Sequence, residues 1–187
     1  MNNPKRIRSD YNKEREAIDV YKGRELLELI QNADDELLDG MGKEIKLSFF
    51  DKILTISNNG SPFSEDGIDS LMYSNISAKA HKKDVIGNKG TGFRAILGWA
   101  KEIRINSGDL SIKFSDNYAQ NILFDILKDS NHSKISKQYR AATLVFPEWV
   151  DGKNKSDYTT DISIHVSDES QIIADIHKQL DDIDGEL

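Results

Sequence analysis

The alternation of apolar and polar positions predicts a chain that begins with helices and continues mainly with strands. Lys13 to Val20 and Arg24 to Leu38 have the pattern of two helices, with Gly23 available to break the chain between them. Ile45 to Phe49 and Ile53 to Ser57 alternate apolar and polar residues, which predicts a pair of strands. The first third of the chain therefore predicts two helices and a hairpin.

The rest of the chain predicts further strands with helices between them. In chain order we expect a helix from Ser64 to Tyr73, a mobile loop from Ser74 to Val85, a helix from Phe93 to Ala100, a hairpin of Ile103–Asn106 and Leu110–Phe114, strands at Ala142–Phe146 and Ile162–Val166, and a helix from Glu169 to Leu180. The apolar segment from Ile122 to Leu127 fits a helix or a strand.

This grouping predicts an α+β fold, with helices on one face of a mixed, mostly antiparallel sheet. The elements do not alternate as βαβαβ, which disfavours a doubly wound sheet. A chain of 187 residues without an internal repeat predicts a single domain over 1–187, with an N-terminal arm over 1–20 and a C-terminal helix within 168–187.

Composition excludes several classes of site. The chain has no cysteine, so disulfides, thiolate zinc sites and cysteine nucleophiles are excluded. No apolar run approaches the roughly 20 residues that cross a membrane, and the polar segment Met1 to Asp10 has no signal core. We expect a soluble, cytoplasmic protein that contacts no membrane.

The charge balance argues against direct nucleic-acid binding by this chain. The net charge is −7, and the only basic cluster near the N-terminus is the short group Lys5, Arg6 and Arg8. Domains that bind nucleic-acid phosphates are usually basic or carry a basic stripe. A solvated tail is the simpler interpretation of that group.

The second expected helix carries a polar stripe with specific chemistry. Glu28, Asn32 and Asp35 recur at i, i+4 and i+7, so they share one face of the helix. An amphipathic helix with a solvated face would also give this pattern. However, asparagine is a mediocre helix former, and its amide oxygen is a hard ligand suited to magnesium. A glutamate one turn away can orient and deprotonate a water molecule.

A glycine-rich segment precedes the expected helix at Phe93. Glycines at 87, 90 and 92 let the main chain approach a phosphate, whose charge the N–H groups of a helix start then face. Lys79 or Lys89 could add positive charge. The spacing matches neither a Walker A loop nor a G-x-G-x-x-G fingerprint. A tight connection between loop and helix is the structural alternative.

In combination, these motifs resemble the GHKL ATPase superfamily (gyrase, heat-shock chaperone, histidine kinase, MutL). Glu28-x-x-x-Asn32-x-x-Asp35 resembles its N-box, Asn58-Asn59-Gly60 its D-x-G-x-G loop, and the run from Gly87 to Phe93 its lid motif. Ala142-Thr143 resembles its closing G-T motif. The resemblance covers roughly residues 11 to 170, in the correct order, and Gly23 to Asp35 is most similar to the sacsin-like, chaperone-like branch.

The resemblance implies a two-layer sandwich of the Bergerat type and a role for each matched residue. Glu28 would be the general base and Asn32 the Mg²⁺ ligand, with Asp35 beside the nucleotide. Asn58 would face the adenine amino group, with Gly60 making room for the base and Thr143 supporting the pocket. Residues 74–90 would form a lid. The residues expected to hold phosphates are Gly87, Gly90, Thr91, Gly92 and Phe93, with Lys79 and Lys89 near them.

Two positions depart from the family pattern. The family usually has aspartate where this chain has Asn58, and a neutral amide makes a weaker hydrogen bond than a carboxylate. The second glycine of that loop is replaced by Ser61-Pro62, and the fixed φ of proline stiffens the turn. Both departures fall in the loop expected to bind adenine, and neither changes the segment expected to bind phosphate.

The function that follows is binding of ATP with Mg²⁺ and slow hydrolysis to ADP and phosphate, coupled to a conformational change in a larger protein. We expect a module at the N-terminus of a longer chain, with downstream domains or another protein as partner and a homodimer on ATP binding. Arg94 is interpreted as a surface residue rather than an arginine finger. Two alternatives stay open, a nucleotide-sensing module without turnover and a histidine-kinase-type catalytic domain. The four histidines, which are His81, His132, His165 and His177, are scattered along the sequence and predict no shared site.

Overall fold

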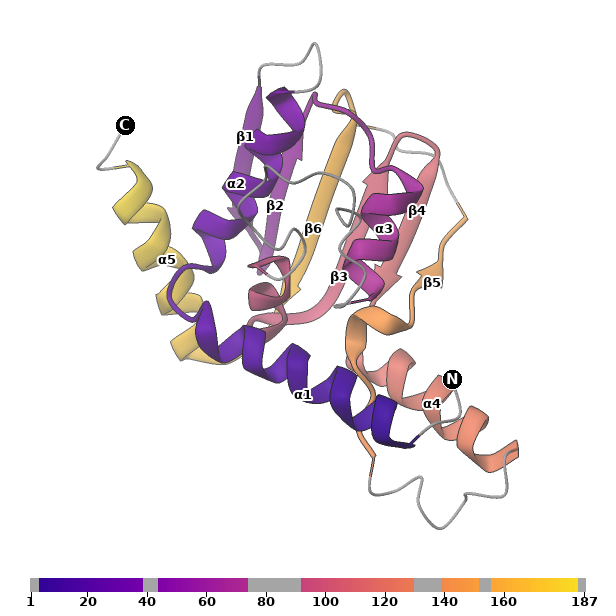
Figure 1. The fold of residues 1–187 in the computed structure, drawn as a ribbon. Helices are drawn as coiled ribbons and strands as arrows, with labels where there is room; N and C mark the ends of the chain where they lie inside the picture. The colour runs from indigo at the N-terminus through magenta and orange to yellow at the C-terminus, as the bar shows by residue number, and fades with distance from the viewer. Residues whose placement is uncertain (1–3, 39–43, 74–91, 130–138, 152–155, 185–187) are drawn as a thin grey trace, which may run out of the picture.

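The computed structural model describes residues 4–38, 44–73, 92–129, 139–151 and 156–184, which form an α+β fold around one six-stranded sheet (Figure 1). The strands are β1 (Ile45–Phe50), β2 (Ile53–Asn58), β3 (Ala100–Ser107), β4 (Leu110–Phe114), β5 (Glu148–Trp149) and β6 (Thr160–Val166). Their spatial order is β1-β2-β6-β3-β4-β5. Each neighbouring pair is antiparallel, so the expectation of a mixed sheet is wrong for the strands described here.

Helices precede, separate and follow these strands. They are α1 (Pro4–Val20), α2 (Glu25–Leu38), α3 (Glu65–Met72), the 3₁₀ helix η1 (Gly92–Gly98), α4 (Asp116–Asp129), the 3₁₀ turn η3 (Thr143–Val145) and α5 (Ser170–Asp184). In Figure 1, α2 and α3 lie over one face of the sheet, while α1 crosses one end of it and α5 lies on the β1 side.

The two faces of the sheet differ in polarity because side chains alternate along each strand. One face is apolar and buried, and its central residues are Leu54, Ile56, Ile103, Ile105, Ile112, Phe114, Ile162 and Ile164. These side chains form one core with Leu26 and Leu29 of α2 and Ile176 of α5. The other face presents Thr55, Ser163 and other polar side chains. The helices therefore cover one side of the sheet, which is consistent with a two-layer arrangement.

The middle of the chain follows the predicted pattern most closely. The helix expected from Arg24 is α2, and the two expected hairpins are β1–β2 and β3–β4. The helix expected at Ser64 is α3, where the Ser64 hydroxyl accepts a hydrogen bond from the Gly67 N–H and so caps the first turn. Ile122 to Leu127 is helical, as part of α4.

Three predicted elements differ from the structure. The first helix begins at Pro4 instead of Lys13, and the helix expected from Phe93 is a 3₁₀ helix. The strand expected at 142–146 is wrong, because Thr143 opens the 3₁₀ turn η3. Its main-chain N–H donates to the Glu14 carboxylate of α1, so that donor is not available to a sheet. The two-residue strand β5 was not predicted, since so short a segment has no alternation to detect.

None of the helices in the described part of the chain combines the length and the apolar composition that crossing a bilayer requires.

Candidate functional site

The glutamate of the expected N-box lies against the end of the glycine-rich segment. Leu26, Leu29 and Ala33 bury one side of α2 in the core, which turns Glu28 toward η1. A Cβ placed on Gly92 would overlap the carboxylate oxygen Oε2 of Glu28 and lie 2.8 Å from its carboxyl carbon. The absence of a side chain at residue 92 is therefore what admits the carboxylate.

Arg24, the residue before α2, flanks this carboxylate. The guanidinium of Arg24 lies 3.4 Å from Oε1 of Glu28, and the Arg24 side chain is 57% exposed while that of Glu28 is 14% exposed. So exposed a pair contributes little to stability, because water screens its charges. Oε1 thus faces Arg24, while Oε2 lies beside Gly92.

Asn32, one turn after Glu28, carries an unsatisfied polar atom. Its side-chain Nδ2 is buried and has no hydrogen-bond partner among the described residues. Leaving a buried amide unpaired costs free energy, so such a group is usually explained by a ligand or a functional role. A 180° rotation of the amide puts its oxygen in the same position, where it could ligate Mg²⁺. Asp35, the third residue of the stripe, is exposed on the same helix.

Asn58 and Gly60 form a tight turn against the end of α2. Asn58 is 3% exposed, and its Oδ1 accepts a hydrogen bond of 3.0 Å from the Gly60 N–H. A Cβ on Gly60 would lie 2.6 Å from the main-chain oxygen of Glu36, which also accepts a hydrogen bond from the Ser61 N–H. Gly60 is therefore required by the close approach of α2, independently of any nucleotide.

The residue that the sheet places beside Asn58 is Thr160. The two are cross-strand partners in the β2–β6 pair, and Thr160 is 2% exposed. Its Oγ1 lies 2.6 Å from the hydroxyl of Ser107, which accepts a hydrogen bond of 2.8 Å from the Phe63 N–H. Asn58, Thr160 and Ser107 thus form a polar row at one end of the otherwise apolar inner face.

The sequence analysis did not single out Thr160, and it expected Thr143 to support the adenine pocket. Thr143 lies on η3, where its main-chain N–H donates 2.7 Å to Glu14 Oε1 and the Leu144 N–H donates 3.2 Å to Oε2. The signal that could have identified Thr160 was the alternation with Ile162 and Ile164, which puts Thr160 on the inner face.

Two buried, oppositely charged side chains near η1, Glu14 and Arg94, were also missed. Glu14 is 5% exposed, and burial raises the pKa of its carboxyl although the amide hydrogen bonds act in the opposite direction. Arg94 is 4% exposed, so its interpretation as a surface residue is wrong. Burial lowers the pKa of Arg94, while the charges of Glu14 and Asp10 raise it. The Nη2 of Arg94 donates 2.7 Å to the Leu71 carbonyl.

The remaining predicted site residues are divided between described and undescribed parts of the chain. The lid over 74–90 and the phosphate-contacting candidates Lys79, Gly87, Lys89, Gly90 and Thr91 lie outside the described residues. Gly92 and Phe93 open η1 and are both buried. Among the described residues no group of three or more His, Asp or Glu side chains could hold a metal ion.

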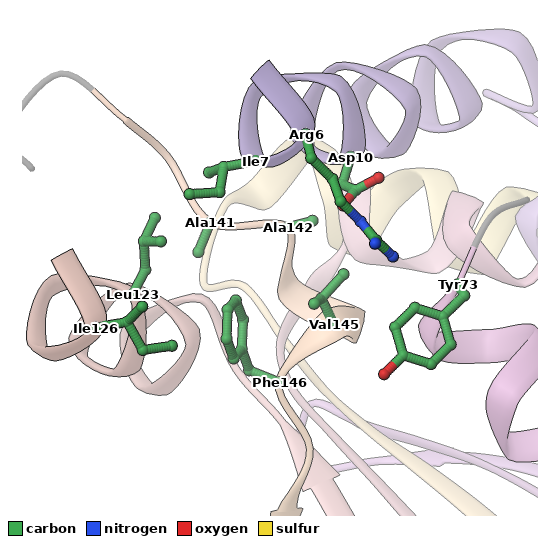
Figure 2. Close-up of a pocket in the computed structure, with 10 residues that line it drawn as sticks. All are labelled: Arg6, Ile7, Asp10, Tyr73, Leu123, Ile126, Ala141, Ala142, Val145 and Phe146. Atoms are coloured by element: carbon green, nitrogen blue, oxygen red, sulfur yellow. The ribbon is translucent and has the colours of Figure 1, made fainter. Parts of the chain in front are cut away.

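A separate pocket lies between α1, α4 and η3 (Figure 2). Its empty volume is about 460 Å³, part of which is open to solvent. Ile7, Leu123 and Phe146 supply apolar lining, and Arg6 and Asp10 stand on α1 with 3.7 Å between their charged atoms. Glu28, Asn32, Asn58 and Gly92 are not among its lining residues, so it is distinct from the site described above.

Comparison with models of known protein families finds no match to the chain, and comparison with curated proteins finds none either. The resemblance to the GHKL superfamily therefore stays a prediction, which rests on the motifs and on the residues that α2, β2, β6 and η1 bring together.

The two glycines of the site should respond differently to substitution. Gly60→Ala should lower the free energy of unfolding by about 1–3 kcal/mol, because its Cβ meets the rigid main chain at Glu36. Gly92→Ala should cost less than about 1 kcal/mol, because the carboxylate that it meets is the end of a flexible side chain. Urea unfolding measures both, and equal losses in the two variants would contradict this account.

The buried Glu14 should make stability depend on pH. Its folded-state pKa is raised above the ordinary value of 4.5, so its contribution is fully present below 4.5 and is lost as pH rises through the folded pKa. The unfolding free energy of wild type, measured relative to that of Glu14→Gln, should therefore fall as pH rises above about 4.5 and level off once the carboxyl has ionised in the folded protein. Urea titrations across that range test this, and a difference that grows with pH would contradict it.

Proposed function

We propose that this chain is a GHKL-type module that binds ATP with Mg²⁺ and hydrolyses the nucleotide slowly. The observation that carries the proposal is the contact between Glu28 and Gly92, which joins an acid on α2 to the start of η1. The unsatisfied amide of Asn32, one turn along α2, supports it. A triphosphate with its metal ion would suit this arrangement, which combines an acid, an amide able to ligate a metal and a main chain without a side chain in the way.

The phosphate end of the site is expected between α2 and η1. Main-chain N–H groups at a helix start face an anion, and phosphate oxygens could approach the main chain of Gly92 once the flexible Glu28 carboxylate turns aside from it. Bound Mg²⁺ would neutralise charge on the phosphate oxygens and would take the Asn32 oxygen as a ligand. The residues present fit that ion, since Asn32 offers a buried amide that has no partner in the described protein.

Glu28 is assigned the role of general base. It would orient a water molecule in line with the γ-phosphorus and accept one of its protons. A bond then forms between the water oxygen and phosphorus, while the bond to the oxygen bridging the β- and γ-phosphates breaks. The products are ADP and inorganic phosphate, and the proton leaves Glu28 for solvent. In the structure the carboxylate lies beside Gly92, with Arg24 3.4 Å from its other oxygen.

The base end of the site is expected at the polar row of the inner face. Asn58 Oδ1 has two lone pairs, of which the Gly60 N–H uses one. The second could accept a hydrogen bond from the adenine amino group. Thr160, the cross-strand partner of Asn58, could hold a water molecule between the protein and the base.

Hydrolysis is expected to be slow because Arg94, two residues after Gly92, is committed elsewhere. It is bonded to the Leu71 carbonyl and its charge interacts with Glu14 and Asp10. A positive group from a downstream domain or a partner protein would then add to the stabilisation of charge at the γ-phosphate. We further propose a cytoplasmic setting and a homodimer that forms on ATP binding.

The role of Glu28 is tested by Glu28→Gln. This variant should bind ATP within about threefold of wild type and lose about a hundredfold or more in turnover, since the amide cannot accept a proton. Asp34→Asn, at an exposed acid of the same helix, should change neither. Calorimetry with ATP, ADP and GTP, with and without Mg²⁺, measures binding, and phosphate release measures turnover.

The possible results separate the alternatives. If the wild-type protein binds no nucleotide, the proposal as a whole is contradicted. Binding without phosphate release above background, equal in wild type and Glu28→Gln, would favour the sensing module. Phosphoryl transfer to a histidine of a partner, in place of phosphate release, would favour the kinase-type domain.

A further inference from the structure

Arg94 connects η1 to the end of α3. It follows Gly92 by two residues in the sequence and is 4% exposed. Its Nη2 donates a hydrogen bond of 2.7 Å to the carbonyl of Leu71, which belongs to the last turn of α3. A guanidinium donor makes this bond stronger than a bond between neutral groups. The side chain therefore holds η1 at a fixed place relative to α3.

A buried cation needs compensating charge, and α1 supplies it. The charges of Glu14 and Asp10 both favour the protonated form of Arg94. Glu14 is itself 5% exposed, and its two carboxylate oxygens accept hydrogen bonds from the Thr143 and Leu144 N–H groups of η3. Hydrogen bonds thus join η1 to α3 and α1 to η3, and the charges of Arg94 and Glu14 act on each other between these two pairs of elements.

The element that this network holds is the one that faces Glu28. A 3₁₀ helix has poorer hydrogen-bond geometry than an α-helix, so η1 depends on tertiary contacts for its position. Both α1 and α2 pack against η1. The α1 contacts include Ile18, whose Cγ2 lies 3.1 Å from the place of a Cβ on Gly98. A shift of η1 would move Gly92 away from or into the Glu28 carboxylate.

We propose that Arg94 is a positioning residue of the nucleotide site, which sets the main chain of Gly92 against Glu28, and that Glu14 fixes Arg94 in turn. This inference rests on the proposed function and deepens it, because it makes α1 a working part of the site. Neither residue touches the substrate in this account. Both act through the placement of η1.

Substituting Arg94 by methionine or by lysine separates the role of its hydrogen bond to Leu71 from the role of its positive charge. Arg94→Met removes the hydrogen bond to Leu71 and leaves the Glu14 carboxylate without its cation, while Arg94→Lys keeps the charge. Glu14→Gln removes the charge from the other side of the pair and keeps one acceptor oxygen for the η3 amides. Arg15→Met makes the same change as Arg94→Met at an exposed position of α1.

The test measures the dissociation constant of Mg-ATP by calorimetry and the thermal midpoint of the same samples. At a temperature where every variant is folded, Arg94→Met should weaken ATP binding by about tenfold or more, because without the hydrogen bond to Leu71 the start of η1 is no longer held against Glu28. Glu14→Gln should weaken binding in the same direction. Arg94→Lys should recover part of the affinity, and Arg15→Met should match wild type.

The inference is overturned if Arg94→Met and Glu14→Gln both lower the thermal midpoint but bind ATP within about twofold of wild type. That result would leave the proposed function standing. Wild type that binds no ATP would overturn both. If Arg94→Met does not fold, Arg94→Lys and Glu14→Gln decide by the same criterion, since each keeps part of the network.

Discussion

The carboxylate of Glu28 can occupy its place only because residue 92 has no side chain. A Cβ there would overlap Oε2 and make the flexible Glu28 side chain move, so a glycine at the start of η1 keeps the acid of α2 in this place. The two residues are far apart in sequence and are joined by the packing of α2 and η1 on the same core. Every functional assignment above depends on that juxtaposition.

The fold supports this contact by fixing α2 from three sides. Leu26 is 0% exposed and Leu29 is 1% exposed, and both side chains anchor the helix on the sheet. The helix end meets Gly60 closely enough that a Cβ there would lie 2.6 Å from the Glu36 carbonyl. At the helix start, the Leu26 N–H donates to Gln179 of α5, which also bonds Glu25. An acid on so constrained a helix is preorganised for chemistry.

The sequence predicted the parts of the site that local periodicity controls. The spacing of Glu28 and Asn32 put them on one face of α2, and alternation identified the inner faces of β1, β2, β3 and β4. It could not identify Thr160 as the neighbour of Asn58, because that relation depends on which strands pair and in what register. It could not show that Arg94 is buried, because an arginine becomes buried only where distant groups such as Glu14 compensate its charge.

The strand expected at 142–146 failed for a related reason. Its apolar residues fit a strand, but the carboxylate of Glu14 binds the main chain of Thr143 and Leu144 and satisfies donors that a sheet would otherwise pair. A single long-range polar contact thus overrode local propensity. The same contact brings α1 into the network around η1, which no motif in the sequence indicates.

The most direct test of the central claim is a crystal structure of the chain with Mg²⁺ and a non-hydrolysable ATP analogue. The account predicts the triphosphate between α2 and the start of η1, with the metal on Asn32, the Glu28 carboxylate toward the terminal phosphate and the base beside Asn58 and Thr160. A nucleotide bound elsewhere, or Glu28 and Asn32 turned away from it, would contradict the account.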